Sequence, residues 1–211
     1  MTRPACVVVS RHAAKANLQR VRELAPSSRV MAVVKADAYG HGLVRIAEAL
    51  GSADAFGVAC LEEAVALRDA GIENPVVLLE GPFSAEELQV TAQLGLETIV
   101  HNEAQLSLLE RTSVKGHIKT WLKIDTGMHR LGFDPPAVAD AYRRLCECDA
   151  VADVPRLMTH FAQAHESDRA AVALQLAVFE EVTAGLVGER SSANSAAGTA
   201  FEPKVYRISP A

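Results

Sequence analysis

Short apolar runs alternate with helical segments along nearly the whole chain. β-Branched residues dominate the runs, which lack the three-to-four-residue spacing of a helical stripe, so each run predicts a buried strand. The expected strands are residues 7–9, 30–34, 55–59, 75–79, 97–100, 117–124, 156–160 and 190–195. The expected helices are residues 10–24, 41–50, 61–70, a segment starting at 84, and then 103–110, 135–146 and 168–186. This alternation predicts parallel strands joined by right-handed crossovers.

Two architectures have this alternation, a (β/α)8 barrel and an open doubly wound sheet. No G-x-G-x-x-G follows the first strand, so the dinucleotide-binding form of the open sheet loses its main support. A barrel takes about 250 residues, or about 200 at the low end, and the tally reaches roughly seven barrel strands before the final stretch. With 211 residues, the expected fold is an α/β, TIM-like barrel that is truncated or incompletely closed near its last strand.

The composition is that of a soluble globular protein, with 49% hydrophobic and 22% charged residues. A net charge of −5 offers no basic field for nucleic acid or for an anionic membrane surface. No apolar stretch is long enough for a secretory signal or a membrane span. The cysteines lack paired metal-ligand spacing, which predicts reduced thiols in a cytoplasmic protein and no metal site. They are Cys6, Cys60, Cys146 and Cys148.

Lys35 is expected at the end of the buried strand 30–34. Burying an unpaired ammonium is costly, so this lysine needs an explanation. Desolvation lowers the pKa of a lysine, and the neutral amine can form a Schiff base with a carbonyl. The alternative is a lysine that extends from the strand end to the surface. Tyr39, Gly40 and Gly42 favour a functional role, because glycine permits close approach of a ligand and a tyrosine hydroxyl can bind a phosphate oxygen.

Three further segments with chemically capable side chains follow predicted strands. They are Thr120–Gly132, which contains Arg130, then Thr159–Phe161 and Ala193–Ala196. In a barrel, functional residues gather at the carboxyl ends of the strands. We therefore expect Lys35 and these segments to share one rim.

The segment around Lys35 and the segment that contains Arg130 both resemble motifs of a known family. Val33–Gly42, which reads VVKADAYGHG, resembles the pyridoxal-phosphate signature of the alanine racemases, and Lys123–Gly132, which reads KIDTGMHRLG, resembles their second distinctive motif. The resemblance implies that Lys35 holds pyridoxal 5'-phosphate covalently and that Tyr39 contacts its phosphate. Arg130 would lie beside the phenolic oxygen of the cofactor and the carboxylate of the substrate.

The same resemblance assigns roles to other rim residues. His160 would pack near the pyridine ring, and Asn194 and Ser195 would contact the phosphate. Without these neighbouring motifs, His160 would be expected to be an ordinary core histidine. Lys123 matches a position that carries a carbamate in some racemases, where the carbamate orients the arginine; the alternative is an ordinary barrel lysine.

The resemblance implies a pyridoxal-phosphate-dependent interconversion of L-alanine and D-alanine, either for peptidoglycan or for alanine catabolism. A racemase needs a base on each face of its substrate. Lys35 would serve the face that carries the Cα proton of D-alanine. The opposite base in the family is a tyrosine from the second domain of the partner subunit in a homodimer. Nothing in the sequence distinguishes alanine from serine as substrate.

The resemblance extends over residues 1–197, the expected N-terminal barrel domain, and residues 198–211 are expected to be a divergent tail. Family members continue with a last barrel strand, which carries an arginine to the pyridine nitrogen, and then with a β-rich domain. Residues 205–210 are either a degenerate form of that strand with Arg207 as the ring partner, a tail joined after a deletion, or unrelated sequence.

Three hypotheses for the function follow. The first is a truncated or divergent racemase-family enzyme that retains cofactor binding and weak chemistry on one face of the substrate. The second is a non-catalytic pyridoxal-phosphate-binding or homeostasis protein. The third is an inactive remnant of a racemase whose unclosed barrel exposes strand edges that are prone to aggregate.

Overall fold

Seven parallel strands form one sheet in a computed structural model that describes residues 6–166 and 170–200. The strands follow one another in the sheet in chain order, so the sheet has no reversal point of the kind that defines a doubly wound fold. The expected barrel-type architecture is therefore confirmed. The strands are β1 (Met31–Val33), β2 (Ala55–Val58), β3 (Val76–Leu78), β4 (Glu97–Val100), β5 (Ile118–Lys123), β6 (Val151–Met158) and β7 (Arg190–Ser191).

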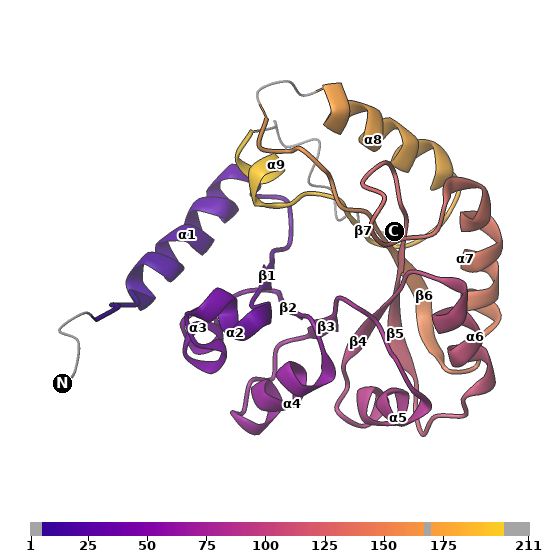
Figure 1. The fold of residues 1–211 in the computed structure, drawn as a ribbon, viewed down its shortest axis with the longest axis horizontal. Helices are drawn as coiled ribbons and strands as arrows, with labels where there is room; N and C mark the ends of the chain where they lie inside the picture. Colours follow the sequence, from indigo (N-terminus) through magenta and orange to yellow (C-terminus); the bar gives the residue numbers. More distant parts are fainter. Residues whose placement is uncertain (1–5, 167–169, 201–211) are drawn as a thin grey trace.

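Helices surround the outside of the curled sheet, as Figure 1 shows. The first and last of the described helices, α1 and α9, contact each other and are neighbours in the ring of helices. In the described ranges β1 pairs with β2 and β7 with β6, and these two edge strands do not pair with each other. The sheet is thus an incompletely closed barrel. The helices are α1 (Arg11–Leu24), α2 (Lys35–Gly40), α3 (Leu43–Ala49), α4 (Leu61–Asp69), α5 (Ala85–Gln93), α6 (Glu103–Arg111), α7 (Val138–Glu147), α8 (Ala170–Val182) and α9 (Ser195–Ala200).

Side-chain caps start three of the helices where the sequence predicts them. The oxygens of Ser10, Ser84 and Asn102 accept hydrogen bonds from backbone amides in the first turns of α1, α5 and α6. Each cap satisfies an amide that has no partner within its own helix. A short 3-10 turn at Pro135–Ala137 precedes α7. Among the described helices, none combines the length and the apolar character needed to cross a membrane.

Several expected boundaries were wrong. Residues 7–9 are not a strand: Val7 and Val8 are 90% and 86% exposed, and strand propensity alone cannot form a ladder without a neighbour. The helix expected from residue 41 begins at Leu43, after a glycine with φ +94°. Helix α8 ends at Val182, four residues early, and β7 covers only the first two of its expected residues.

The start of β6 was placed five residues too late. The strand begins at Val151 and runs through Pro155, where the pairing register with β5 shifts. Proline within a sheet is found at edges and bulges, because it has no amide to donate. Pro155 therefore looks like the end of a loop in the sequence, but it lies within the strand.

Apolar residues from alternate positions fill the middle of the curl. Val77, Ile99, Trp121 and Met158 form a buried cluster there, and Met31 of β1 packs against them. Gly57 of β2 leaves room for this layer: a Cβ atom on it would lie 3.2 Å from the sulfur of Met31. Two larger clusters fill the space between the sheet and the helices.

A chain of ion pairs crosses the amino-terminal end of this interior. Glu97 of β4 is buried and accepts hydrogen bonds from Trp121 Nε1 at 2.8 Å and from Arg156 Nη1 at 2.6 Å. The Arg156 guanidinium also lies over the Trp121 ring and pairs with Glu189 at 2.7 Å. Glu189 in turn pairs with Arg29. Because Glu189 precedes β7 and Arg29 precedes β1, the chain of charges spans the gap between the two edge strands.

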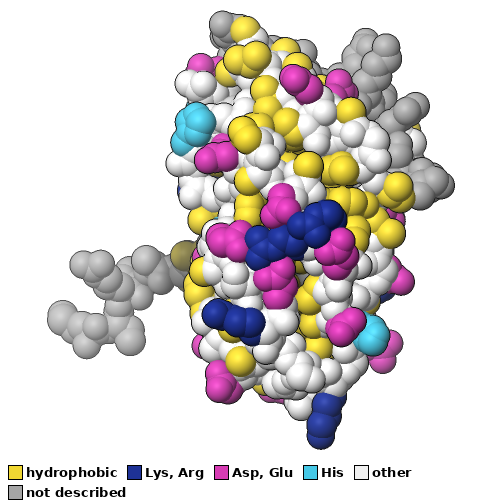
Figure 2. Space-filling model, turned by 90° about the vertical axis from the view of Figure 1, so that its right-hand side faces the viewer, with side chains coloured by type: hydrophobic (Ala, Val, Ile, Leu, Met, Phe, Trp, Pro, Cys, Tyr) yellow, Lys and Arg dark blue, Asp and Glu magenta, His cyan; other side chains and the backbone are white. Residues whose placement is uncertain are grey.

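Charged side chains on the outer face are arranged differently. Basic side chains lie among acidic ones on the surface shown in Figure 2. Arg143 on α7, for example, pairs with Asp140 and Glu147 along its own helix, and its side chain is 55% exposed. Exposed pairs of this kind contribute little to stability, because water and salt screen them.

Arg156→Met is expected to lower the free energy of unfolding by about 3 kcal/mol, because it leaves the buried carboxylate of Glu97 without its counter-ion. Arg143→Met, which removes the same charge from the outer face, should have a much smaller effect, because water and salt screen its ion pairs. Urea unfolding of both variants measures the difference. Equal losses would show that the interior ion pairs do not hold the open barrel together.

Candidate active site

Lys35 lies two residues after the end of β1, at the carboxyl end of the sheet. The amide of the preceding residue, Val34, still donates to Gly57 O of β2 at 2.8 Å, so the backbone is fixed up to the lysine. The next four residues, 36–39, all have left-handed backbone angles, with φ between 52° and 55°. The segment α2 is therefore a left-handed turn and not an ordinary helix. For residues with a side chain, this conformation costs roughly 1–2 kcal/mol each.

A carboxylate from another element contacts this turn. Glu63, in the first turn of α4, accepts hydrogen bonds through Oε1 from the amides of Ala36 at 2.6 Å and Asp37 at 3.4 Å. Its Oε2 accepts from the amide of Ala59, just beyond β2, at 2.8 Å. Glu63 is not among the site residues predicted from the sequence. An acid in the first turn of a helix is common, because it favours the positive end of the helix dipole, so its type and position gave no distinctive signal.

A second turn presents Arg130 on the same rim. Asp125, two residues after β5, accepts through Oδ1 from the amides of Gly127, Met128 and His129 at 2.9 to 3.0 Å. The chain then returns past Gly132, where a Cβ atom would lie 2.4 Å from Asp125 N. Only glycine fits there. The Arg130 side chain is exposed on the resulting loop.

Positive groups converge at this rim. Burial, together with the charges of Arg130 and Lys35, lowers the pKa of Lys123 to about 8. Burial also lowers the pKa of His160 to about 4, with the charges of Lys123, Arg130 and Lys35 acting in the same direction. The structure thus brings these four predicted residues within electrostatic reach of one another. An excess of positive charge in a partly desolvated site favours an anionic ligand.

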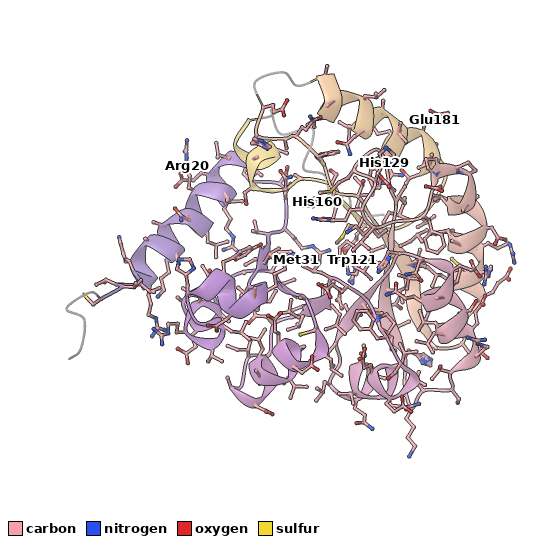
Figure 3. All side chains as sticks on the ribbon, viewed as in Figure 1. Arg20, Met31, Trp121, His129, His160 and Glu181 are labelled. Atoms are coloured by element: carbon pink, nitrogen blue, oxygen red, sulfur yellow. The ribbon has the colours of Figure 1, made fainter. Side chains whose placement is uncertain are left out.

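His160 follows β6 and lies inside the ring of helices with Met31 and Trp121, whereas Arg20 and Glu181 lie on the outer side (Figure 3). The neighbouring Thr159 donates to Ile124 O at 3.0 Å and shares a hydrogen bond of 2.8 Å with the Thr126 hydroxyl. These contacts connect the segment after β6, which carries His160, to the loop that carries Arg130. With its lowered pKa, His160 is uncharged at neutral pH.

Asn194 and Ser195 follow β7 on the same side of the sheet. The amide nitrogen of Asn194 donates to Phe161 O at 3.1 Å, and its oxygen accepts from the amide of Ala197 at 3.0 Å, so Asn194 caps α9. Ser195 is the exposed first residue of α9. Tyr39 lies in the left-handed turn and is 62% exposed. The predicted phosphate contacts of these residues stay predictions, and Arg207 lies outside the described residues.

The expected boundary after residue 197 falls within α9 (Ser195–Ala200). The division of the chain into residues 1–197 and 198–211 also stays a prediction.

Comparison with known proteins identifies the family of the chain. Residues 9–208 match a family model described as the N-terminal domain of alanine racemase. The chain belongs to the alanine racemase family. It is 55% identical over 191 residues to an alanine racemase of Nitrosococcus oceani, an alignment that covers 90% of this chain and 53% of the relative. It is 50% identical to one from Shewanella loihica, again over 90% of this chain and 53% of the relative.

Solved structures of this family share the fold. The biosynthetic alanine racemase of Pseudomonas aeruginosa superposes with a TM-score of 0.84 at 38% identity, covering 88% of this chain and 52% of that one. A histidine racemase from Leuconostoc mesenteroides superposes with a TM-score of 0.82 at 27% identity, covering 94% and 55%. The chain thus spans about half the length of the relatives it matches. Alanine racemases depend on pyridoxal 5'-phosphate.

Lys123→Met is expected to raise the free energy of unfolding at pH 7 by about 1–2 kcal/mol, because a lowered pKa means that the fold disfavours the charged amine. The native pKa of about 8 lies below the ordinary value of 10.5. The gain should therefore be full below pH 8 and shrink towards pH 10.5. Urea unfolding in carbon-dioxide-free buffer measures it, with Lys119→Met, an exposed lysine of the same strand, as control. A destabilised Lys123→Met variant would contradict the expectation.

His160 should lower the stability of the folded state in mild acid. Its native pKa of about 4 lies below the ordinary value of 6.5, so the unfolded chain binds the proton more tightly and stability falls as the pH drops from 6.5 to 4. In His160→Asn this part of the pH dependence should disappear. Thermal unfolding at pH 7 and pH 5 tests this, and an unchanged difference between the two midpoints would refute the assignment.

Proposed function

We propose that this chain binds pyridoxal 5'-phosphate through Lys35 and forms the cofactor-binding barrel of a racemase that acts on alanine. The observation that carries the proposal is the convergence of Lys35, Lys123 and Arg130 on an uncharged His160 at one rim of the barrel. Membership of the alanine racemase family supports it independently.

The residues at the rim fit the chemistry of this cofactor. Pyridoxal phosphate carries a phosphate and a phenolic oxygen, and an amino-acid substrate adds a carboxylate, so the bound groups are mainly anionic. The amine of Lys35 would hold the cofactor, and the guanidinium of Arg130 suits the phenolic oxygen and the carboxylate. His160 would pack against the ring without adding charge. Tyr39, Asn194 and Ser195 are the proposed phosphate contacts, and Arg207 is the proposed partner of the ring nitrogen.

When bound, the cofactor supplies a sink for the electron pair released when the Cα proton leaves. The protein must then move that proton. Lys35 Nζ would accept and return it on one face of the substrate, and Arg130 would keep the carboxylate oriented. In the family the base on the other face is a tyrosine of the partner subunit, so full racemisation is proposed for the assembled homodimer.

Lys123 has a proposed role beside Arg130. With a pKa of about 8, a substantial fraction of its side chain is the neutral amine near that pH. The neutral amine is the form that adds carbon dioxide to give a carbamate. A carbamate on Lys123 would place a negative charge next to Arg130 and fix its guanidinium.

The substrate is proposed from sequence identity, since the fold alone does not select it. The relatives at about 50% identity are named alanine racemases, whereas the neighbour named histidine racemase is 27% identical. We therefore propose alanine as the substrate and D-alanine supply or alanine catabolism as the pathway context. A cytoplasmic location is part of the same proposal and is supported by four cysteines that are not disulfide-bonded.

Exchange of the alanine Cα proton with solvent tests this function directly. With added cofactor in D2O, D-alanine should exchange faster than L-alanine, because Lys35 serves the face of the D-enantiomer. Lys35→Ala should reduce the exchange by about 100-fold or more, as expected for loss of a general base. Lys15→Ala, which changes an exposed lysine of α1, should leave it unchanged.

The visible absorbance band of lysine-bound cofactor separates the remaining alternatives. A band without proton exchange would indicate a cofactor-binding protein that is not an enzyme. A folded chain without a band would contradict the proposed function and favour an inactive remnant.

A further inference from the structure

We propose that Glu63 is a positioning residue for Lys35: its carboxylate holds the left-handed turn 36–39 in the conformation that presents the lysine to the rim. The inference rests on the proposed function for the role of Lys35. The contact between Glu63 and the turn stands on its own geometry.

The turn needs a partner from outside itself. Residues 36–39 read Ala-Asp-Ala-Tyr, and none is glycine, the one residue that adopts this conformation without steric cost. Asp37 stabilises the far end from within, since its Oδ1 accepts from the amide of Leu43 at 2.7 Å. At the near end, next to Lys35, the amides of Ala36 and Asp37 point to Glu63.

Glu63 connects this near end to the sheet. One carboxylate oxygen serves the turn and the other serves Ala59, beyond β2. An ionised carboxylate offers acceptors on both oxygens, and its hydrogen bonds are stronger than neutral ones. Gln has the same shape but only one acceptor oxygen, so it cannot satisfy both sides. The glutamate therefore fixes the backbone one residue after the lysine, against the strand that pairs with β1.

The position of the lysine amine depends on this backbone. Lys35 is fixed on its amino-terminal side by the β1–β2 pairing and on its carboxyl-terminal side by Glu63. If the near end of the turn relaxed to right-handed angles, the Lys35 side chain would leave the position from which its charge acts on Lys123 and His160. Misplacing a reacting group by about 1 Å can cost about 100-fold in rate.

An ordinary helix-start role for Glu63 makes a different prediction, and Glu62 is the matched control. Both acids lie in the first turn of α4 and both favour the helix dipole. The Glu62 carboxylate interacts with Cys60 and with its own backbone, not with the turn. Glu62→Gln and Glu63→Gln therefore remove the same charge from the same helix end, and only the second breaks the contact with residues 36 and 37.

The test compares Glu63→Gln, Glu62→Gln and the unchanged chain by amide hydrogen exchange and by titration with pyridoxal phosphate. In Glu63→Gln the amides of Ala36 and Asp37 should exchange at least about tenfold faster, and the lysine-bound absorbance band should need about 10- to 100-fold more cofactor. Glu62→Gln should match the unchanged chain in both measurements. Unchanged exchange at residues 36 and 37 in Glu63→Gln, or an equal loss in Glu62→Gln, would overturn the proposal.

A second-site change keeps the test decisive if Glu63→Gln folds poorly. Ala36 is exposed, and glycine at this position removes the steric cost of the left-handed angle. Glu63→Gln combined with Ala36→Gly should recover at least part of the cofactor binding. A well-folded double variant with no recovery would show that Glu63 does not act through the turn. If the unchanged chain itself forms no band, the proposed function fails, while the amide exchange still decides whether Glu63 holds the turn.

Discussion

The left-handed turn after Lys35 is the constraint on which the rest of the site depends. Four consecutive residues in this conformation cost roughly 4–8 kcal/mol, a large part of the 5–15 kcal/mol by which a typical domain is stable. Such strain persists only where the surroundings determine the backbone on both sides. Here the backbone before the turn is fixed by the pairing of β1 with β2. The turn itself is held by the carboxylate of Glu63 at its start and by the contact with Leu43 of α3 at its end. The backbone of Lys35 is therefore fixed on both sides, and this helps to determine where its flexible side chain lies.

Charge is distributed differently at the two ends of the barrel interior. At the amino-terminal end, Glu97, Arg156, Glu189 and Arg29 satisfy one another and cross the gap between the edge strands. At the carboxyl-terminal end, burial and then the positive charges nearby lower the pKa values of Lys123 and His160. The apolar layer around Trp121 separates the two ends. The ion pairs at the amino-terminal end stabilise the open barrel. The positive charge at the carboxyl-terminal end favours the binding of an anion.

Sequence reasoning identified the architecture because local rules agreed with it. The caps at Ser10, Ser84 and Asn102 mark helix starts by their residue type, and the apolar runs mark the strands. It failed where tertiary contacts override local preference. A proline inside β6 imitates a strand end, and residues 7–9 have strand propensity without a partner. The left-handed turn has no sequence signal because it contains no glycine, and Glu63 resembles any first-turn acid until its contact with residue 36 is seen.

We propose that the rim selects Lys35 as the lysine that carries the cofactor. Borohydride reduction of the chain with pyridoxal phosphate, followed by peptide mapping, identifies the modified lysine directly. We expect a single modified peptide that contains Lys35, formed at a cofactor concentration too low to label the exposed lysines Lys15 and Lys119. Labelling spread over the exposed lysines, or concentrated on Lys123, would contradict it.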